Sequence, residues 1–83
     1  MDHYLFIVRS ITQAQQATRI LERSGISSQI FRAPATLTDR GCSYAVQIRA
    51  NSALPARQAV QQAGLQPLKI VRKNHGVYQE EPL

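Results

Sequence analysis

Two periodicities divide the chain into strands and helices. Four stretches are continuously apolar or alternate between apolar and polar residues, which is typical of β-strands; they cover residues 3–9, 26–33, 42–50 and 68–72. Two further stretches carry apolar residues every three or four positions, which is the pattern of an amphipathic helix. The first helix is expected over residues 13–24, and the second begins after a cap at Asn51 or Ser52 and ends at Gly64.

The order of these elements, βαββαβ, predicts an α+β fold. Each βα unit closes on a glycine, at Gly25 and Gly64, and right-handed crossovers favour a ferredoxin-like sandwich. We expect a four-stranded antiparallel sheet with both helices on one face and with the first and third strands at its centre. A single domain is predicted over residues 1–73, followed by a C-terminal tail over residues 74–83 with a turn at His75-Gly76. The alternative is another small α+β arrangement in which the tail adds a strand.

The face of the sheet opposite the helices is expected to be apolar and uncovered. Leu5, Ile7 and Val71 point to this face if their strands alternate regularly. An exposed apolar face favours self-association, so a homodimer through the open sheet face is expected unless the tail supplies the cover through Tyr78.

Length and cysteine content limit the class of protein. The chain has 83 residues, which suits one domain, and a single cysteine, which excludes an intramolecular disulfide. The N-terminus lacks the basic and apolar regions of a signal peptide. The longest apolar run, residues 4–8, is much shorter than a membrane span. These features predict a cytoplasmic protein that does not associate with membranes.

The chain is basic, with a net charge of +5 and a pI near 10.2. Such a charge attracts anions, including nucleic acid. The eight arginines and two lysines are spread along the sequence, however, and only Arg72 and Lys73 are adjacent. A solvated basic surface therefore explains the pattern as well as a nucleic-acid site does. If nucleic acid binds, neutralising Arg72 and Lys73 should weaken the binding.

Cys42 is the candidate reactive residue, because a thiol at a junction between a polar loop and a strand can be exposed and electropositive. The predicted topology brings this junction to the end of the sheet where the first helix begins. The residues expected to support Cys42 there are Arg9, Ser10, Thr12, Arg32, Arg40, Gly41 and Ser43. A helix N-terminus and nearby cations lower a thiol pKa, so we expect Cys42 to titrate below an ordinary thiol.

The alternative for Cys42 is a structural role. It shares its strand face with Tyr44, Val46 and Ile48, and burial on an apolar face would raise its pKa instead. No other catalytic set is recognisable: neither His3 nor His75 has a cysteine or carboxylate at metal-ligand spacing, so no metal and no cofactor are expected. We therefore expect a carrier or binding protein rather than a turnover enzyme.

Several short motifs resemble those of the putative selenium/sulfur carrier-like family of small bacterial proteins. They are a first strand that ends on a polar pair, an early alanine in the first helix, a Ser-Gly-Ile turn, a proline after the second strand and a loop that leads to a cysteine. In this chain they are residues 6–10, Ala14, residues 24–26, Pro34 and Cys42. The family's loop typically reads Cys-Gly, whereas this chain has Cys42-Ser43 with the glycine at Gly41.

The resemblance implies that Cys42 carries a persulfide or perselenide between a donor protein and an acceptor protein. Such transfer needs one nucleophilic thiolate and no metal. Two other classes stay open: a protein-interaction module, and an RNA-binding module of the ferredoxin-like type. RNA binding of that type uses aromatic side chains on the open face of the central strands, and the third strand presents Ala45, Gln47 and Arg49 there instead.

Overall fold

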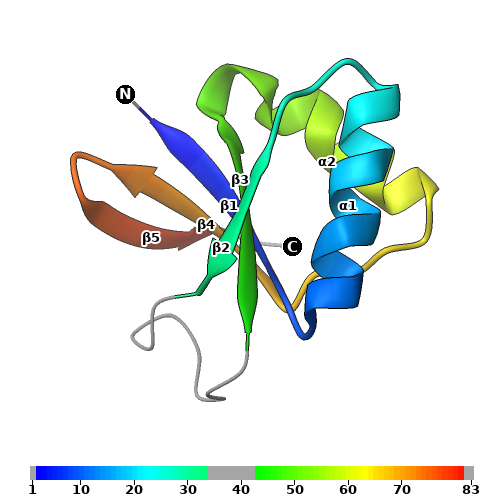
Figure 1. Ribbon diagram of the computed structural model, residues 1–83. Coiled ribbons are helices and arrows are strands. Elements are labelled where there is room, and N and C mark those ends of the chain that lie inside the picture. Colours follow the sequence, from blue (N-terminus) through cyan, green and yellow to red (C-terminus); the bar gives the residue numbers. More distant parts are fainter. Residues whose placement is uncertain (1, 34–42, 82–83) are drawn as a thin grey trace.

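The computed structural model describes residues 2–33 and 43–81. Within these ranges the chain forms a single five-stranded sheet and two α-helices (Figure 1). In chain order the elements are β1 (His3–Val8), α1 (Ile11–Arg23), β2 (Gln29–Arg32), β3 (Tyr44–Arg49), the 3-10 turn η2 (Ala50–Ser52), α2 (Ala53–Gln62), β4 (Lys69–Asn74) and β5 (Val77–Glu81). The strands lie in the order β2-β3-β1-β4-β5, and every neighbouring pair is antiparallel.

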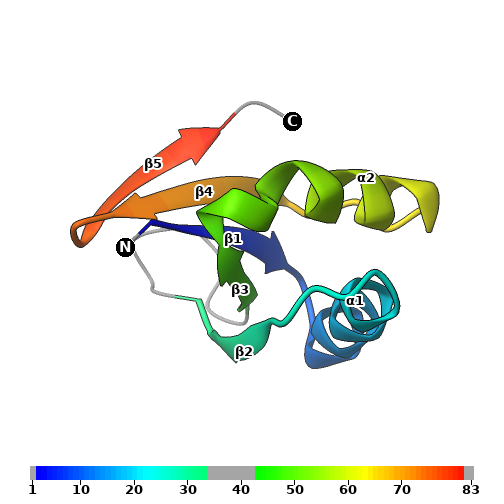
Figure 2. The same cartoon turned by 90° about the horizontal axis from the view of Figure 1, so that it is seen from above.

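The predicted α+β class and the order βαββαβ of the first six helices and strands are confirmed. β1 lies between β3 and β4, and β3 lies between β2 and β1, so both strands expected at the centre of the sheet are flanked on two sides (Figure 2). The predicted count of four strands is wrong, because part of the segment expected as a tail forms β5 beside β4. The described residues therefore form an α+β fold with two helices and a five-stranded antiparallel sheet, which is the alternative arrangement in which the tail adds a strand.

A two-residue turn creates the fifth strand. His75 and Gly76 have φ values of 52° and 79°, and Asn74 pairs with Val77 across them. Positive φ at both central residues is the signature of a type I′ turn, whose twist matches that of the two strands it joins. The sequence correctly predicts the turn, but Gln79, Glu80 and Glu81 look too polar for a strand. Edge strands tolerate such residues because one side and one face meet solvent.

Both helices end in the same way, which explains the repeated glycines. After α1, the N–H of Gly25 donates to the carbonyl of Glu22, and the N–H of Ile26 donates to the carbonyl of Leu21. After α2, Gly64 and Leu65 make the equivalent bonds to Gln61 and Val60. Both ends are Schellman motifs, which require a left-handed residue at the position that Gly25 and Gly64 occupy.

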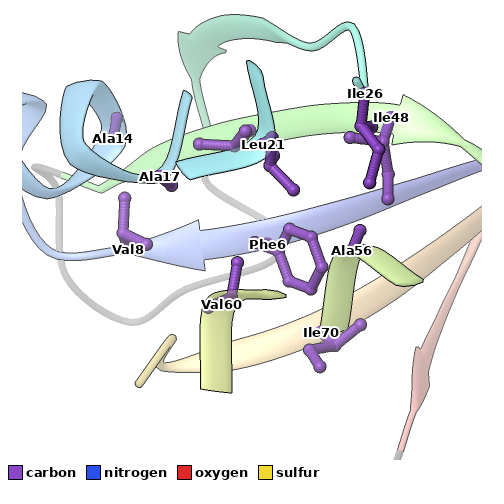
Figure 3. Close-up of a cluster of buried hydrophobic side chains, with 11 residues drawn as sticks. Phe6, Val8, Ala14, Ala17, Leu21, Ile26, Ile48, Ala56, Val60 and Ile70 are labelled. Atoms are coloured by element: carbon purple, nitrogen blue, oxygen red, sulfur yellow. The ribbon is translucent and has the colours of Figure 1, made fainter. Parts of the chain in front are cut away.

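The main hydrophobic core lies between the helices and one face of the sheet (Figure 3). Even-numbered residues of β1 point into it, among them Phe6 and Val8, while α1 and α2 contribute a stripe of small and branched side chains. The buried members are Phe6, Val8, Ala14, Ala17, Leu21, Ile26, Val46, Ile48, Ala56, Val60 and Ile70. The prediction that both helices cover the same face is confirmed.

The opposite face of the sheet holds a second, smaller cluster of buried residues: Leu5, Ile7, Ala45 and Val71. Leu5 and Ile7 are 0% exposed and Val71 is 1% exposed, so the prediction of an uncovered apolar face is wrong. Tyr78 on β5 and Phe31 on β2 pack against the cluster from the two edges of the sheet. The homodimer expectation consequently loses the exposed apolar face on which it depended.

Candidate functional site

The strand ends predicted to surround Cys42 lie together at one end of the sheet. The register aligns Arg32, at the end of β2, with Tyr44, at the start of β3, and aligns Tyr44 in turn with Val8, at the end of β1. Beyond this row, the N–H of Ala33 donates to the carbonyl of Ser43 at 2.9 Å. We call this region, residues 8–13, 31–33, 43–44 and 65–69, the loop end of the sheet.

Helix α1 begins at the loop end and is capped by Ser10. The Ser10 side-chain oxygen accepts a hydrogen bond from the backbone N–H of Gln13 at 3.2 Å. The Gln13 side chain reaches back and accepts from the N–H of Arg9 at 3.1 Å, which resembles a capping box displaced by one residue. Ser10, one of the residues expected near Cys42, is therefore the N-cap of α1. Thr12 is an exposed residue in the first turn of the helix.

The charged residues at the loop end are all basic. Arg9 follows β1 and Arg32 ends β2, and both are exposed. Lys69 begins β4 opposite Ile7 and is half-buried. The positive end of the α1 dipole lies at the same place. Within the residues that define the loop end, charge and dipole thus have the same sign, which favours an anion or a thiolate over a neutral group.

Ser43 is the last of the predicted supporting residues that the structure describes. It is 3% exposed, and its carbonyl holds the end of β2 through Ala33. Tyr44, Val46 and Ile48 alternate onto the helix-covered face of β3, and Ala45 belongs to the cluster on the other face. The predicted facing of β3 is thus confirmed for these residues. Cys42, Arg40 and Gly41 lie outside the described residues.

A hollow of about 490 Å³ opens beside α2 and extends to the loop end. Phe6, Val60 and Ile70 are the buried side chains that line it, and Leu65 and Pro67 lie where it reaches the turn before β4. Its described polar lining consists of Arg57, Gln61 and Gln66. Such a lining offers binding contacts but no acid, base or nucleophile for chemistry.

Neighbouring cations in β4 lie on opposite faces of the sheet. Arg72 points to the helix side, where it makes an ion pair with Asp2 at 2.9 Å and lies over the Tyr4 ring at 6.0 Å. The hydrogen bond from Arg72 to Asp2 raises the pKa of the guanidinium. Lys73 points to the other face and lies over the Tyr78 ring at 5.7 Å. Arg72 and Lys73 are adjacent in the sequence but do not form one basic patch in the structure.

The described residues contain no candidate metal site and no helix that could span a membrane. Residues 2–33 and 43–81 contain no group of three or more histidine, cysteine, aspartate or glutamate side chains that could hold a metal ion. None of the helices in these ranges is long and apolar enough to cross a membrane.

The protein is thus a small α+β domain in which α1 begins at a basic end of the sheet, the loop end. The family described as "Putative Se/S carrier protein-like" matches residues 3–72, which is most of the chain, and the protein belongs to this family. The resemblance seen in the sequence motifs is thereby confirmed. No curated protein and no solved structure matches the chain.

Proposed function

We propose that this protein carries sulfur or selenium on Cys42, as a persulfide or perselenide, between a donor protein and an acceptor protein. The observation that carries the proposal is the family match over residues 3–72, which includes the only cysteine of the sequence. The basic loop end supports it. Ser43, the residue next to Cys42, is fixed to Ala33 there, beside the start of α1 and between strands that end in cations.

The transfer is an exchange in which atoms and electrons balance. The Cys42 thiolate attacks the terminal sulfur of a donor persulfide, the S–S bond of the donor breaks, and the donor leaves as a thiolate. Cys42 keeps the transferred sulfur as its own persulfide. An acceptor thiolate then attacks that terminal sulfur and restores the Cys42 thiolate. No external oxidant or reductant is consumed, and a selenium atom in the terminal position would be exchanged in the same way.

The test is loading with sodium polysulfide, followed by removal of the reagent and intact-mass measurement. The unmodified protein should gain sulfur, and Cys42→Ser should gain none while its circular dichroism spectrum stays unchanged. A matched control moves the thiol by one residue, in the double variant Cys42→Ser with Ser43→Cys. Because Ser43 is 3% exposed, the displaced thiol should load much more slowly.

Thiol titration is the second arm of the same test, measured as the rate of alkylation against pH. The midpoint should fall below the ordinary value of about 8.5, toward the upper part of the range of roughly 3.5 to 7.5 known for activated thiols. Arg9→Gln, Arg32→Gln and Arg40→Ala should raise it, and Arg23→Gln, at the other end of α1, should not. Equal loading of the displaced thiol, or an ordinary midpoint insensitive to these arginines, would leave Cys42 a structural residue.

A further inference from the structure

A row of basic side chains crosses the sheet at the end opposite to the loop end. His3 of β1 is aligned with Arg49 of β3 on one side and with Lys73 of β4 on the other. Lys73 is aligned in turn with Tyr78 of β5. Neighbouring strands are about 5 Å apart, so Arg49 and Lys73 start roughly 10 Å from each other with His3 between them. We call Arg49, His3 and Lys73 the basic row.

All three side chains of the basic row belong to the sheet face that the helices do not cover. β1 pairs without interruption from His3 to Val8, so His3 shares a face with Leu5 and Ile7 of the second cluster. Arg49 follows Ile48, which points toward the helices, and Lys73 lies over the ring of Tyr78. Arg49 is exposed, and His3 and Lys73 are half-buried, so a ligand in solvent can reach the row.

The charge around the basic row is less balanced than the charge on the helix side. On the helix side, the carboxylate of Asp2 pairs with Arg72 and neutralises its charge. On the face of the basic row, the acidic residue among those described is Glu80, which is aligned with Val71, one row further along the sheet. Two permanent cations and an imidazole therefore share a surface with one displaced carboxylate, in a protein whose net charge is +5.

We infer that the basic row binds phosphate groups of a nucleic-acid backbone. Arginine and lysine side chains that neutralise backbone phosphates release counterions, and this release drives binding without base recognition. A chain of phosphates can contact Arg49 and Lys73 simultaneously, whereas one small anion on such an exposed row competes poorly with water and salt. Tyr78 packs against the second cluster beneath Lys73, so its ring supports the row rather than stacking on a base.

The experiment measures the binding of a labelled single-stranded RNA by fluorescence anisotropy over a range of salt concentrations. The test variant is Arg49→Gln with Lys73→Gln. The matched control is Arg19→Gln with Arg23→Gln, which removes the same charge from exposed positions of α1 in the helix layer. Circular dichroism and urea unfolding should show that both double variants remain folded.

We expect the test variant to bind more weakly and to lower the salt slope by roughly 0.7 for each lost phosphate contact. The control should keep the slope of the unmodified protein. Equal losses in both variants would mean that net charge alone attracts the RNA, and would overturn the site. If inorganic phosphate displaces the RNA when its concentration equals that of the RNA phosphate groups, the basic row is a simple anion site and the nucleic-acid assignment is wrong.

This inference is independent of the carrier function. The basic row and the loop end lie at opposite ends of β1, which runs from His3 to Val8. Cys42→Ser should therefore bind RNA like the unmodified protein. Loss of RNA binding in Cys42→Ser would place the contact at the loop end and contradict the assignment to the basic row.

Discussion

The two faces of the sheet are built from the same strands but differ in the size of the hydrophobic cluster that each one buries. On the helix side, eleven buried residues from strands, helices and the turn after α1 form one cluster. On the other side, four buried residues form the second cluster, and all four lie on strands. β1 contributes to both clusters through simple alternation. The difference indicates that the helix side supplies most of the folding energy, and that the thin second cluster supports a surface rich in charge.

The neighbouring cations Arg72 and Lys73 lie on opposite faces of the sheet and differ in their partners. Each cation lies over a tyrosine ring, Arg72 over Tyr4 and Lys73 over Tyr78. Arg72 also has the carboxylate of Asp2, and its charge is used within the fold. Lys73 instead joins His3 and Arg49 in the basic row. The same kind of residue is therefore structural on one face and available to a ligand on the other.

The largest expected effect comes from truncating the two faces at neighbouring positions of β1. Phe6→Ala should lower the free energy of unfolding by about 3–5 kcal/mol, because it leaves a cavity near Ala56, Val60 and Ile70 (Figure 3). Ile7→Ala should cost about 2–4 kcal/mol, since fewer carbon atoms are lost from a smaller cluster. Urea titration measures both values.

The relative size of the two losses of unfolding free energy shows which face of the sheet contributes more to stability. Phe6→Leu serves as a milder variant if Phe6→Ala does not fold, because it keeps most of the apolar volume. If Ile7→Ala is at least as destabilising as Phe6→Ala, the second cluster contributes at least as much stability as the main core, and the helix side is not dominant.

A smaller loss of stability is expected from removing the N-cap of α1, one of the two helices that cover the main core. Ser10→Ala removes the acceptor for the Gln13 N–H and should lower the free energy of unfolding by about 1 kcal/mol. Thr12→Ala is the matched control, because Thr12 is exposed and its position in the first turn does not cap the helix; its effect should stay within about 0.5 kcal/mol. Equal losses for both variants in thermal or urea unfolding would show that Ser10 is not the effective cap.

The smallest effect is expected from Asp2→Asn, which leaves Arg72 without its anionic partner. Arg72 is 40% exposed, so solvent screens the pair and the loss of stability should be slight. A raised pKa stabilises the fold wherever the arginine of the unfolded chain is protonated, and this contribution is lost only as the pH rises through the folded pKa. The loss in Asp2→Asn should therefore persist from neutral to mildly alkaline pH and shrink with added salt. A loss that is insensitive to salt would require another role for Asp2.

Much of the fold follows from the sequence because its signals are local and agree with one another. A continuous apolar run locates β1 and apolar alternation locates β3. Helical spacing locates both helices, and Gly25 and Gly64 mark the helix ends. The fifth strand was foreseen only in the alternative arrangement, because its stability comes from pairing with β4 and from the packing of Tyr78, neither of which appears in a polar segment read alone. The expectation of an uncovered sheet face failed for the same reason, and the stated alternative, cover from the tail through Tyr78, is what the structure shows.

The two candidate sites differ in how far the sequence reveals them. The gathering of Arg9, Ser10 and Arg32 at the loop end follows from topology alone, because strand direction determines which ends meet. The basic row depends on register, and three residues from three distant segments cannot be aligned before the pairing is known. The sequence singled out Lys73 only together with Arg72, and it gave no signal that His3 and Arg49 lie beside Lys73.

The central position of β1 has a consequence for the order in which the protein is made. Tyr4 pairs with Ile48 on β3 and with Arg72 on β4, so β1 leaves the ribosome before both of its partner strands have been made. Loop closure over such separations must precede the gain from pairing. During translation, Leu5 and Ile7 therefore stay unpaired until β3 and β4 have emerged.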